Sequence, residues 1–138
     1  METGLLLIKL SSVIYILLGS VHILLTLFTS SFEPRDSDVL ALINATSPNI
    51  STQTTLWAGG VGFHFSHSLG LIIFGVLYFS LVQEAPFLIY ESLVFSYALF
   101  VIPSIYLFLS LRYWFVVPSI GFVVSGLGYV MGSQFLGG

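Results

Sequence analysis

Four long apolar stretches run through this sequence, and their length decides the solvent in which the chain can fold. They cover residues 5–29, 55–82, 87–110 and 113–136. A helix needs about 20 apolar residues to cross the hydrocarbon core of a bilayer, so each stretch can span it. Soluble domains carry about 25% charged residues, whereas this chain of 138 residues has 7% charged and 57% hydrophobic residues. We therefore predict a single integral, multi-pass transmembrane domain over residues 1–138, with the lipid bilayer around it.

The connections between the stretches predict how the spans are arranged. The second and third stretches are separated by residues 83–86, and the third and fourth meet at residues 111–112. Connections this short force neighbouring helices to run antiparallel, which favours an all-α, up-down four-helix bundle. The remaining connection, residues 30–54, is long and polar, and we expect within it a short helix capped by Asp36 or Ser37.

Charge and cysteine content exclude several classes of function. Six acidic and three basic residues give a net charge of −3, and the Lys and Arg residues form no cluster. A nucleic-acid partner needs a basic surface, so none is expected. The chain has no cysteine, which excludes disulfides, thiolate nucleophiles, iron–sulfur clusters and cysteine zinc sites. Hydrolase motifs such as G-x-S-x-G and H-E-x-x-H are also absent from the sequence.

Small residues mark one face of each predicted span, and the fourth span shows this most clearly. Helices in lipid associate through small and polar residues, because lipid itself does not drive them together. On the fourth span this face consists of Gly121, Ser125, Gly128 and Gly132. Gly128 and Gly132 have the small-x-x-x-small spacing that lets two backbones approach closely. The face is expected to pack within the bundle or against another membrane protein.

Three histidines, His22, His64 and His67, are the only ones in the chain, and the spans place them at one depth in the bilayer. His22 lies near the end of the first span, and His64 and His67 lie at a similar depth in the second. These spans are antiparallel neighbours, so the three imidazoles can converge. The i, i+3 spacing puts His64 and His67 on one helix face. Ionisable residues inside a membrane are costly and usually mark a site.

Several ligands suit such a histidine cluster. Neutral imidazole binds zinc, copper and iron, and His22, His64 and His67 would together supply three ligands to a transition metal. Two histidines on facing helices can hold a haem as axial ligands, and one can ligate the magnesium of a chlorophyll-type pigment. Imidazole can also hydrogen-bond the head group of a quinone or a sterol. In the alternative interpretation the histidines are structural, and each hydrogen-bonds a neighbouring helix.

A resemblance adds a family to this interpretation. At the motif Gly19-x-x-His22 and over residues 62–70 (Gly-Phe-His-Phe-Ser-His-Ser-Leu-Gly), the chain resembles a widespread group of small four-span bacterial membrane proteins of unassigned function. The architecture is similar to that of DoxX-like four-helix proteins. The resemblance implies that His22 and His67 form the shared pair, and that His64 is particular to this chain because an amide is more usual there. Loss of His22 or of His67 would then have the same effect.

Two functions are expected from these observations. The first is a non-catalytic accessory or cofactor-binding subunit of a larger membrane complex. Its histidine cluster would hold haem, a chlorophyll-type pigment, a transition metal or a polar ligand. The second is a small membrane enzyme, either an oxidoreductase that uses haem or quinone, or an isomerase of a lipid-like substrate with histidine as acid or base. A bound redox-active chromophore favours the oxidoreductase, and a polar pocket that opens to lipid favours the isomerase.

Overall fold

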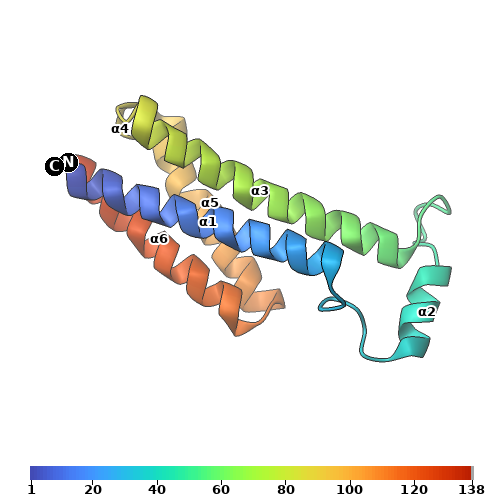
Figure 1. Cartoon of the computed structure of the whole chain (residues 1–138). Coiled ribbons are helices and arrows are strands. Elements are labelled where there is room, and N and C mark those ends of the chain that lie inside the picture. The colour runs from blue at the N-terminus through green and yellow to red at the C-terminus, as the bar shows by residue number, and fades with distance from the viewer. Residues whose placement is uncertain (138) are drawn as a thin grey trace. The chain divides into compact units, whose positions relative to one another are not determined.

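Helices make up most of the computed structural model, which describes residues 1–137 (Figure 1). The helices within these residues are α1 (Glu2–Phe28), α2 (Ser37–Ala45), α3 (Leu56–Glu84), α4 (Leu88–Glu91), α5 (Leu93–Tyr113) and α6 (Val116–Gly137). Four of them, α1, α3, α5 and α6, are long and apolar enough to cross a membrane. This architecture confirms the predicted all-α, four-helix bundle.

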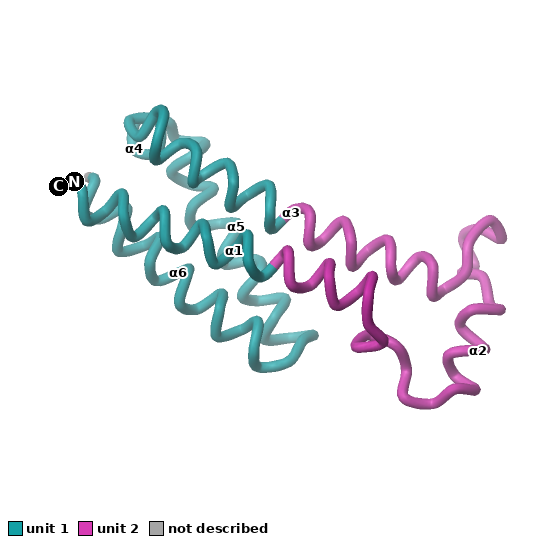
Figure 2. The backbone as a smooth tube through the Cα atoms, viewed as in Figure 1, with its two compact units in different colours: residues 1–18, 71–138 teal, residues 19–70 magenta. Residues whose placement is uncertain are grey.

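The helices belong to two compact units (Figure 2). The first unit consists of residues 1–18 and 71–138, and it holds the first part of α1, the second part of α3, and α4, α5 and α6. The second unit, residues 19–70, holds the rest of α1, the loop with α2, and the start of α3. The buried hydrophobic core lies in the first unit, and all three histidines lie in the second.

Small residues let α6 approach α1 in the first unit. A Cβ atom on Gly132 would lie 2.9 Å from the carbonyl oxygen of Gly4, and a Cβ atom on Gly128 would overlap the hydroxyl of Ser11. Larger residues at these positions would force the two helices apart. The small-residue face predicted for the fourth span therefore packs inside the bundle. Its members, which are buried or lie against α1, are Gly121, Ser125, Gly128 and Gly132.

Aromatic side chains fill the core of the first unit. The fully buried Tyr15 of α1 lies at its centre, with its ring centroid 5.0 Å from that of Phe74 and 5.5 Å from that of Phe122. These rings are tilted or edge-on to one another, which is an arrangement that aromatic quadrupoles favour. The hydroxyl of Tyr78 donates a hydrogen bond to the carbonyl oxygen of Phe95 at 2.6 Å. Helices α1, α3, α5 and α6 thus meet around one aromatic cluster.

The third span begins later in the structure than the predicted range of residues 87–110. Helix α5 starts at Leu93 because Ser92 is extended, with φ −91° and ψ 118°, and the single turn α4 precedes it. The hydroxyl of Ser96 donates to the carbonyl oxygen of Ile89 at 2.7 Å. This bond gives the carbonyl a partner that the interrupted helix cannot supply. The residues on both sides of the break are apolar, so hydropathy alone does not reveal it.

The turn between α5 and α6 also differs from the prediction, which placed it at residues 111–112. Helix α5 continues through Arg112 to Tyr113. A cation in the last helical turn interacts favourably with the helix dipole, and the guanidinium of Arg112 lies 5.2 Å from the ring centroid of Tyr113. Next to the turn, the hydroxyls of Ser110 and Ser119 share a hydrogen bond of 2.6 Å that ties the two helices together.

Helix α2 lies in the loop of the second unit, close to where the sequence predicted a short helix. Oδ1 of Asp36 accepts hydrogen bonds from the backbone N–H groups of Asp38 at 2.9 Å and Val39 at 3.4 Å. These bonds confirm the capped helix and select Asp36 over Ser37 as its N-cap. No residue of α2 is buried among the described residues, so apolar side chains such as that of Leu42 face the surroundings.

Candidate functional site

Helices α1 and α3 bring the three histidines of the second unit together. His22 lies on α1, and His64 and His67 lie one turn apart on α3. Nε2 of His22 and Nδ1 of His64 are joined by a hydrogen bond of 3.0 Å, and the two ring centroids are 5.1 Å apart. The ring of His67 meets that of His22 edge-on, with the centroids 5.7 Å apart. The direct bond thus joins His22 to His64, whereas the resemblance paired His22 with His67.

The hydroxyl groups one helical turn after these histidines bind the backbone instead of the imidazoles. Oγ1 of Thr26 donates to the carbonyl oxygen of His22 at 2.8 Å, and Oγ of Ser68 donates to that of His64 at 2.8 Å. Serine and threonine in helices often donate to the carbonyl four residues earlier. Within residues 1–137, the bond between His22 and His64 is consequently the one hydrogen bond that either imidazole makes.

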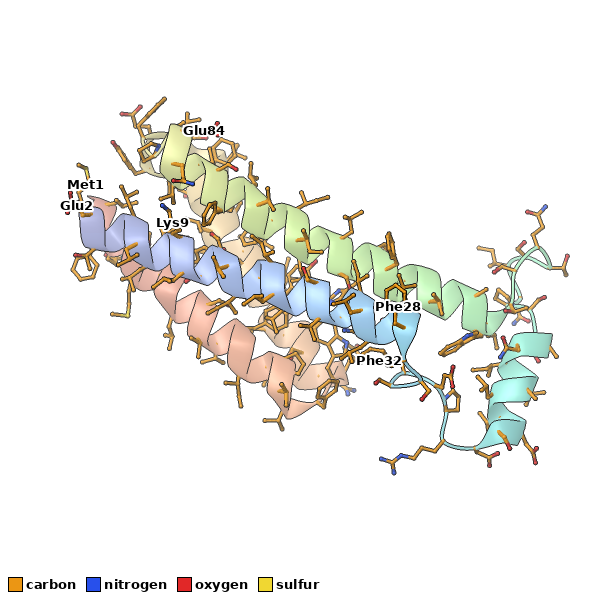
Figure 3. The ribbon with its side chains drawn as sticks, in the orientation of Figure 1. Met1, Glu2, Lys9, Phe28, Phe32 and Glu84 are labelled. Carbon is orange, nitrogen blue, oxygen red and sulfur yellow. The ribbon has the colours of Figure 1, made fainter. Side chains whose placement is uncertain are left out.

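Phe32 covers the histidine pair, and the sequence did not predict it as part of the site. Its ring centroid lies 4.6 Å from that of His22 and 4.8 Å from that of His64. Figure 3 shows Phe32 in the segment that follows α1. It is the only aromatic residue in the connection of residues 30–54. This property could have identified Phe32 as a candidate site residue from the sequence.

The arrangement gives no support to a metal centre at His22, His64 and His67. Within residues 1–137, no group of three His, Cys, Asp or Glu side chains is placed to hold a metal ion. The carboxylate of Asp36, in the connection of residues 30–54, caps α2. A haem held by His22 and His64 would need the two rings to separate, because the porphyrin occupies the space between its axial ligands.

Comparison with known proteins adds no family. Known protein families, curated proteins and solved structures give no match to this chain. The similarity to DoxX-like proteins stays a prediction from the sequence.

As a neutral pair, His22 and His64 present one hydrogen-bond donor and one acceptor to a ligand. Each neutral imidazole has one N–H donor and one acceptor nitrogen, and the bond between the rings uses one of each. The outer nitrogens, Nδ1 of His22 and Nε2 of His64, hold the remaining proton and the remaining lone pair. If both rings change tautomer, the outer nitrogens exchange these roles. The pair therefore suits a ligand group such as a hydroxyl or a carbonyl.

Proposed function

We propose that this chain is a non-catalytic membrane binding protein in which His22 and His64 hold the polar head of a lipid-soluble ligand. The observation that carries this proposal is the 3.0 Å hydrogen bond between the two imidazoles, whose outer nitrogens have no hydrogen bond within residues 1–137. Polar groups at membrane depth are costly and are kept where they are paired or functional. A hydroxyl or carbonyl of the ligand would complete the hydrogen bonding of the pair.

The position of Phe32 supports an uncharged ligand. Its ring puts an apolar surface against both His22 and His64, and hydrogen bonds are stronger where water is excluded. Both histidines stay partly exposed beside this cover, so a ligand can still reach them. The neighbouring side chains of Val21 and Phe63 are exposed and apolar, which suits a ligand that arrives through lipid.

The surroundings of the pair argue against a mechanism that uses a hydroxyl nucleophile. A nucleophile in an acid–base mechanism is activated by a hydrogen bond to its base. The hydroxyls of Thr26 and Ser68 donate to backbone carbonyls, so they do not form this contact with either imidazole. A site that binds without its own nucleophile suits an accessory subunit of a larger membrane complex, in which another component performs the chemistry.

The test is to identify what the purified protein carries. We would extract the full chain into nanodiscs with its native lipids, and then analyse the bound compounds by mass spectrometry and the same sample by absorbance. One compound with a hydroxyl or carbonyl head should be enriched over bulk lipid. Its occupancy should fall by about tenfold in His22→Ala and in His64→Ala, since about 1.4 kcal/mol of lost hydrogen bonding is a factor of ten.

Ser66→Ala is the matched control for these variants. Ser66 lies on α3 between the two histidines of that helix, but its hydroxyl donates to the carbonyl oxygen of Phe63 at 3.1 Å. This variant should keep the compound. Retention of the compound in His22→Ala or in His64→Ala would contradict the shared site. If the wild-type protein carries no enriched compound, a structural role for the histidines is the remaining interpretation. A bound haem or quinone that is reduced and reoxidised in turnover would establish the oxidoreductase instead.

A further inference from the structure

Two adjoining cavities lie along α5 and α6 in the first unit. One is a groove of about 210 Å³, and the other is a pocket of about 370 Å³. Leu99 and Phe100 line both, so the groove continues into the pocket along α5. None of the histidines or Phe32 belongs to either lining. Neither cavity therefore shares a lining residue with the histidine pair.

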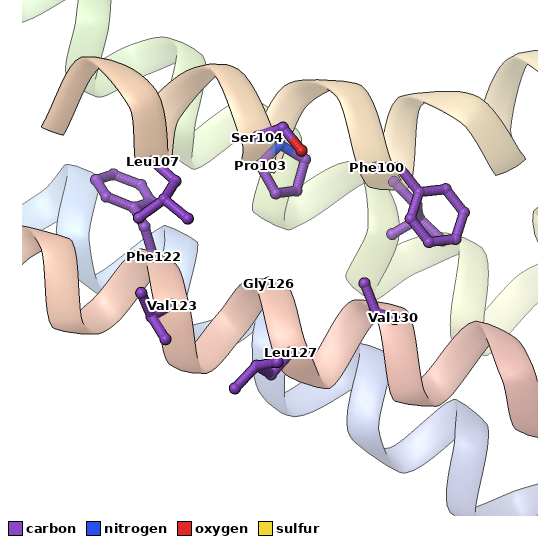
Figure 4. A pocket seen from close by; sticks show the side chains of 10 residues that line it. Phe100, Pro103, Ser104, Leu107, Phe122, Val123, Gly126, Leu127 and Val130 are labelled. Atoms are coloured by element: carbon purple, nitrogen blue, oxygen red, sulfur yellow. The ribbon is translucent and has the colours of Figure 1, made fainter. Parts of the chain in front are cut away.

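The groove is apolar, as Figure 4 shows. Pro103 and Leu107 of α5 lie across it from Phe122 of α6, and Ser104 supplies the one polar side chain among the described lining residues. Gly126 lies in the middle of the α6 side, where a Cβ atom would meet no heavy atom within 4 Å. The glycine thus leaves the middle of the groove open to an apolar chain.

The pocket, in contrast, has both polar and apolar walls. Its polar side chains are those of Tyr90, Ser96, Ser133 and Gln134. Ser96 and Ser133 donate to backbone carbonyls at 2.7 and 2.8 Å, so their oxygens remain as acceptors. The hydroxyl of Tyr90 and the amide of Gln134 make no hydrogen bond to any part of the chain that the structure describes. The described lining includes no Lys or Arg, so no cation is there to bind a phosphate or a carboxylate.

The order of the two cavities matches the change of polarity across a membrane. Tyr90 belongs to the short helix α4 that precedes the long apolar α5, and Gln134 lies in the last turn of α6. From Gln134 to Phe122, α6 covers twelve positions, or about 18 Å at about 1.5 Å per residue. A polar pocket at the end of the span and a groove that runs from it toward the middle fit the head and the tail of one molecule.

We propose that the groove and the pocket together bind one uncharged, single-chain amphiphile of the monoacylglycerol class. Its acyl chain occupies the groove beside Gly126, and its hydroxyls and ester carbonyl hydrogen-bond Tyr90 and Gln134 in the pocket. An anionic head is disfavoured, because the charged residue adjacent to Tyr90 in the chain is Glu91 and the described lining offers no cation. This site shares no residue with the histidine pair, so neither proposal depends on the other.

Binding of monooleoylglycerol to the full chain in detergent, followed by native mass spectrometry, tests this site. Gly126→Leu fills the groove and Gln134→Leu removes a partner of the head, and we expect each to weaken binding by about tenfold or more. Val124→Leu is the matched control, because Val124 is an exposed residue of α6 that lines neither cavity. Oleate has the same chain with an anionic head, and it should bind about tenfold more weakly than monooleoylglycerol.

Three results would overturn the proposal. Equal binding by Gly126→Leu and Val124→Leu would mean that lipid covers the surface of α6 without using the groove. Oleate binding as tightly as monooleoylglycerol would contradict recognition of an uncharged head. Circular dichroism shows whether Gly126→Leu folds. If Gly126→Leu does not fold, the test rests on the exposed-site variant Gln134→Leu, and unchanged binding of monooleoylglycerol by that variant overturns the proposal.

Discussion

Replacement of Gly75 by alanine tests how closely α3 approaches α1 in the first unit. A Cβ atom at this position would lie 2.6 Å from the carbonyl oxygen of Ser12, 2.7 Å from Cγ1 of Ile16 and 3.1 Å from the backbone nitrogen of Ile16. Two of these three atoms belong to the backbone, so a change of side-chain rotamer cannot relieve the overlap. The helices must move apart, and such overpacking costs about 1–3 kcal/mol.

Gly126→Ala is the control that isolates this cost. Its Cβ atom would meet no heavy atom within 4 Å. Both variants replace glycine by alanine within a helix, and both gain about 1 kcal/mol of helix propensity. That gain cancels when the two are compared, so the free energy of unfolding of Gly75→Ala should be about 1–3 kcal/mol below that of Gly126→Ala. Gly126→Ala itself should be at least as stable as the wild type.

The assay is reversible unfolding in mixed micelles with increasing sodium dodecyl sulfate, followed by far-UV circular dichroism. The three proteins are compared at the same protein and lipid concentrations, so that differences in the midpoint report stability. If Gly75→Ala unfolds at the same detergent fraction as Gly126→Ala, α1 and α3 do not make the close backbone contact described above, and the reasoning is wrong.

The core tyrosines and the cap of α2 give two more predictions. Tyr15→Phe removes a buried hydroxyl that has no hydrogen-bond partner within residues 1–137, whereas Tyr78→Phe removes the 2.6 Å bond to the carbonyl of Phe95. The same titration should show no loss for the first and a loss of about 0.5–1.5 kcal/mol for the second, and the reverse order would refute this account. Asp36→Ala removes the N-cap of α2 and should cost about 1 kcal/mol locally. Amide hydrogen exchange at Asp38 should then be about fivefold faster, and unchanged exchange would exclude the cap as a source of stability.

The number of spans could be predicted from the sequence because apolar length is a local property. Four stretches long enough to cross a bilayer are visible without any knowledge of contacts, and the structure has four such helices. Helix ends were less predictable. The extended Ser92 lies among apolar residues and leaves no mark in the hydropathy, and Arg112 looked like a turn residue although a cation is favourable at the end of a helix.

For the candidate site, too, some features could be predicted from the sequence and others depend on how the helices pack. The convergence of the histidines was predicted from their positions along two antiparallel spans, and the structure brings the three rings together. The choice of His64 over His67 as the bonded partner of His22 depends on how the helices are rotated about their axes. The position of Phe32 against both imidazoles depends on the path of the loop after α1. The loop sequence has no periodic pattern from which this path could be predicted.

Apolar length along the chain was enough to predict four membrane spans, and residue position was enough to predict that the three histidines converge. Knowledge of the helix packing was needed to see which small residues of α6 face α1, which imidazole nitrogens meet, and where α5 and α6 leave a groove. Position along a helix axis follows from residue number because the rise per residue is constant. The rotation and the closest approach of two helices depend instead on all the side chains that meet at their contact.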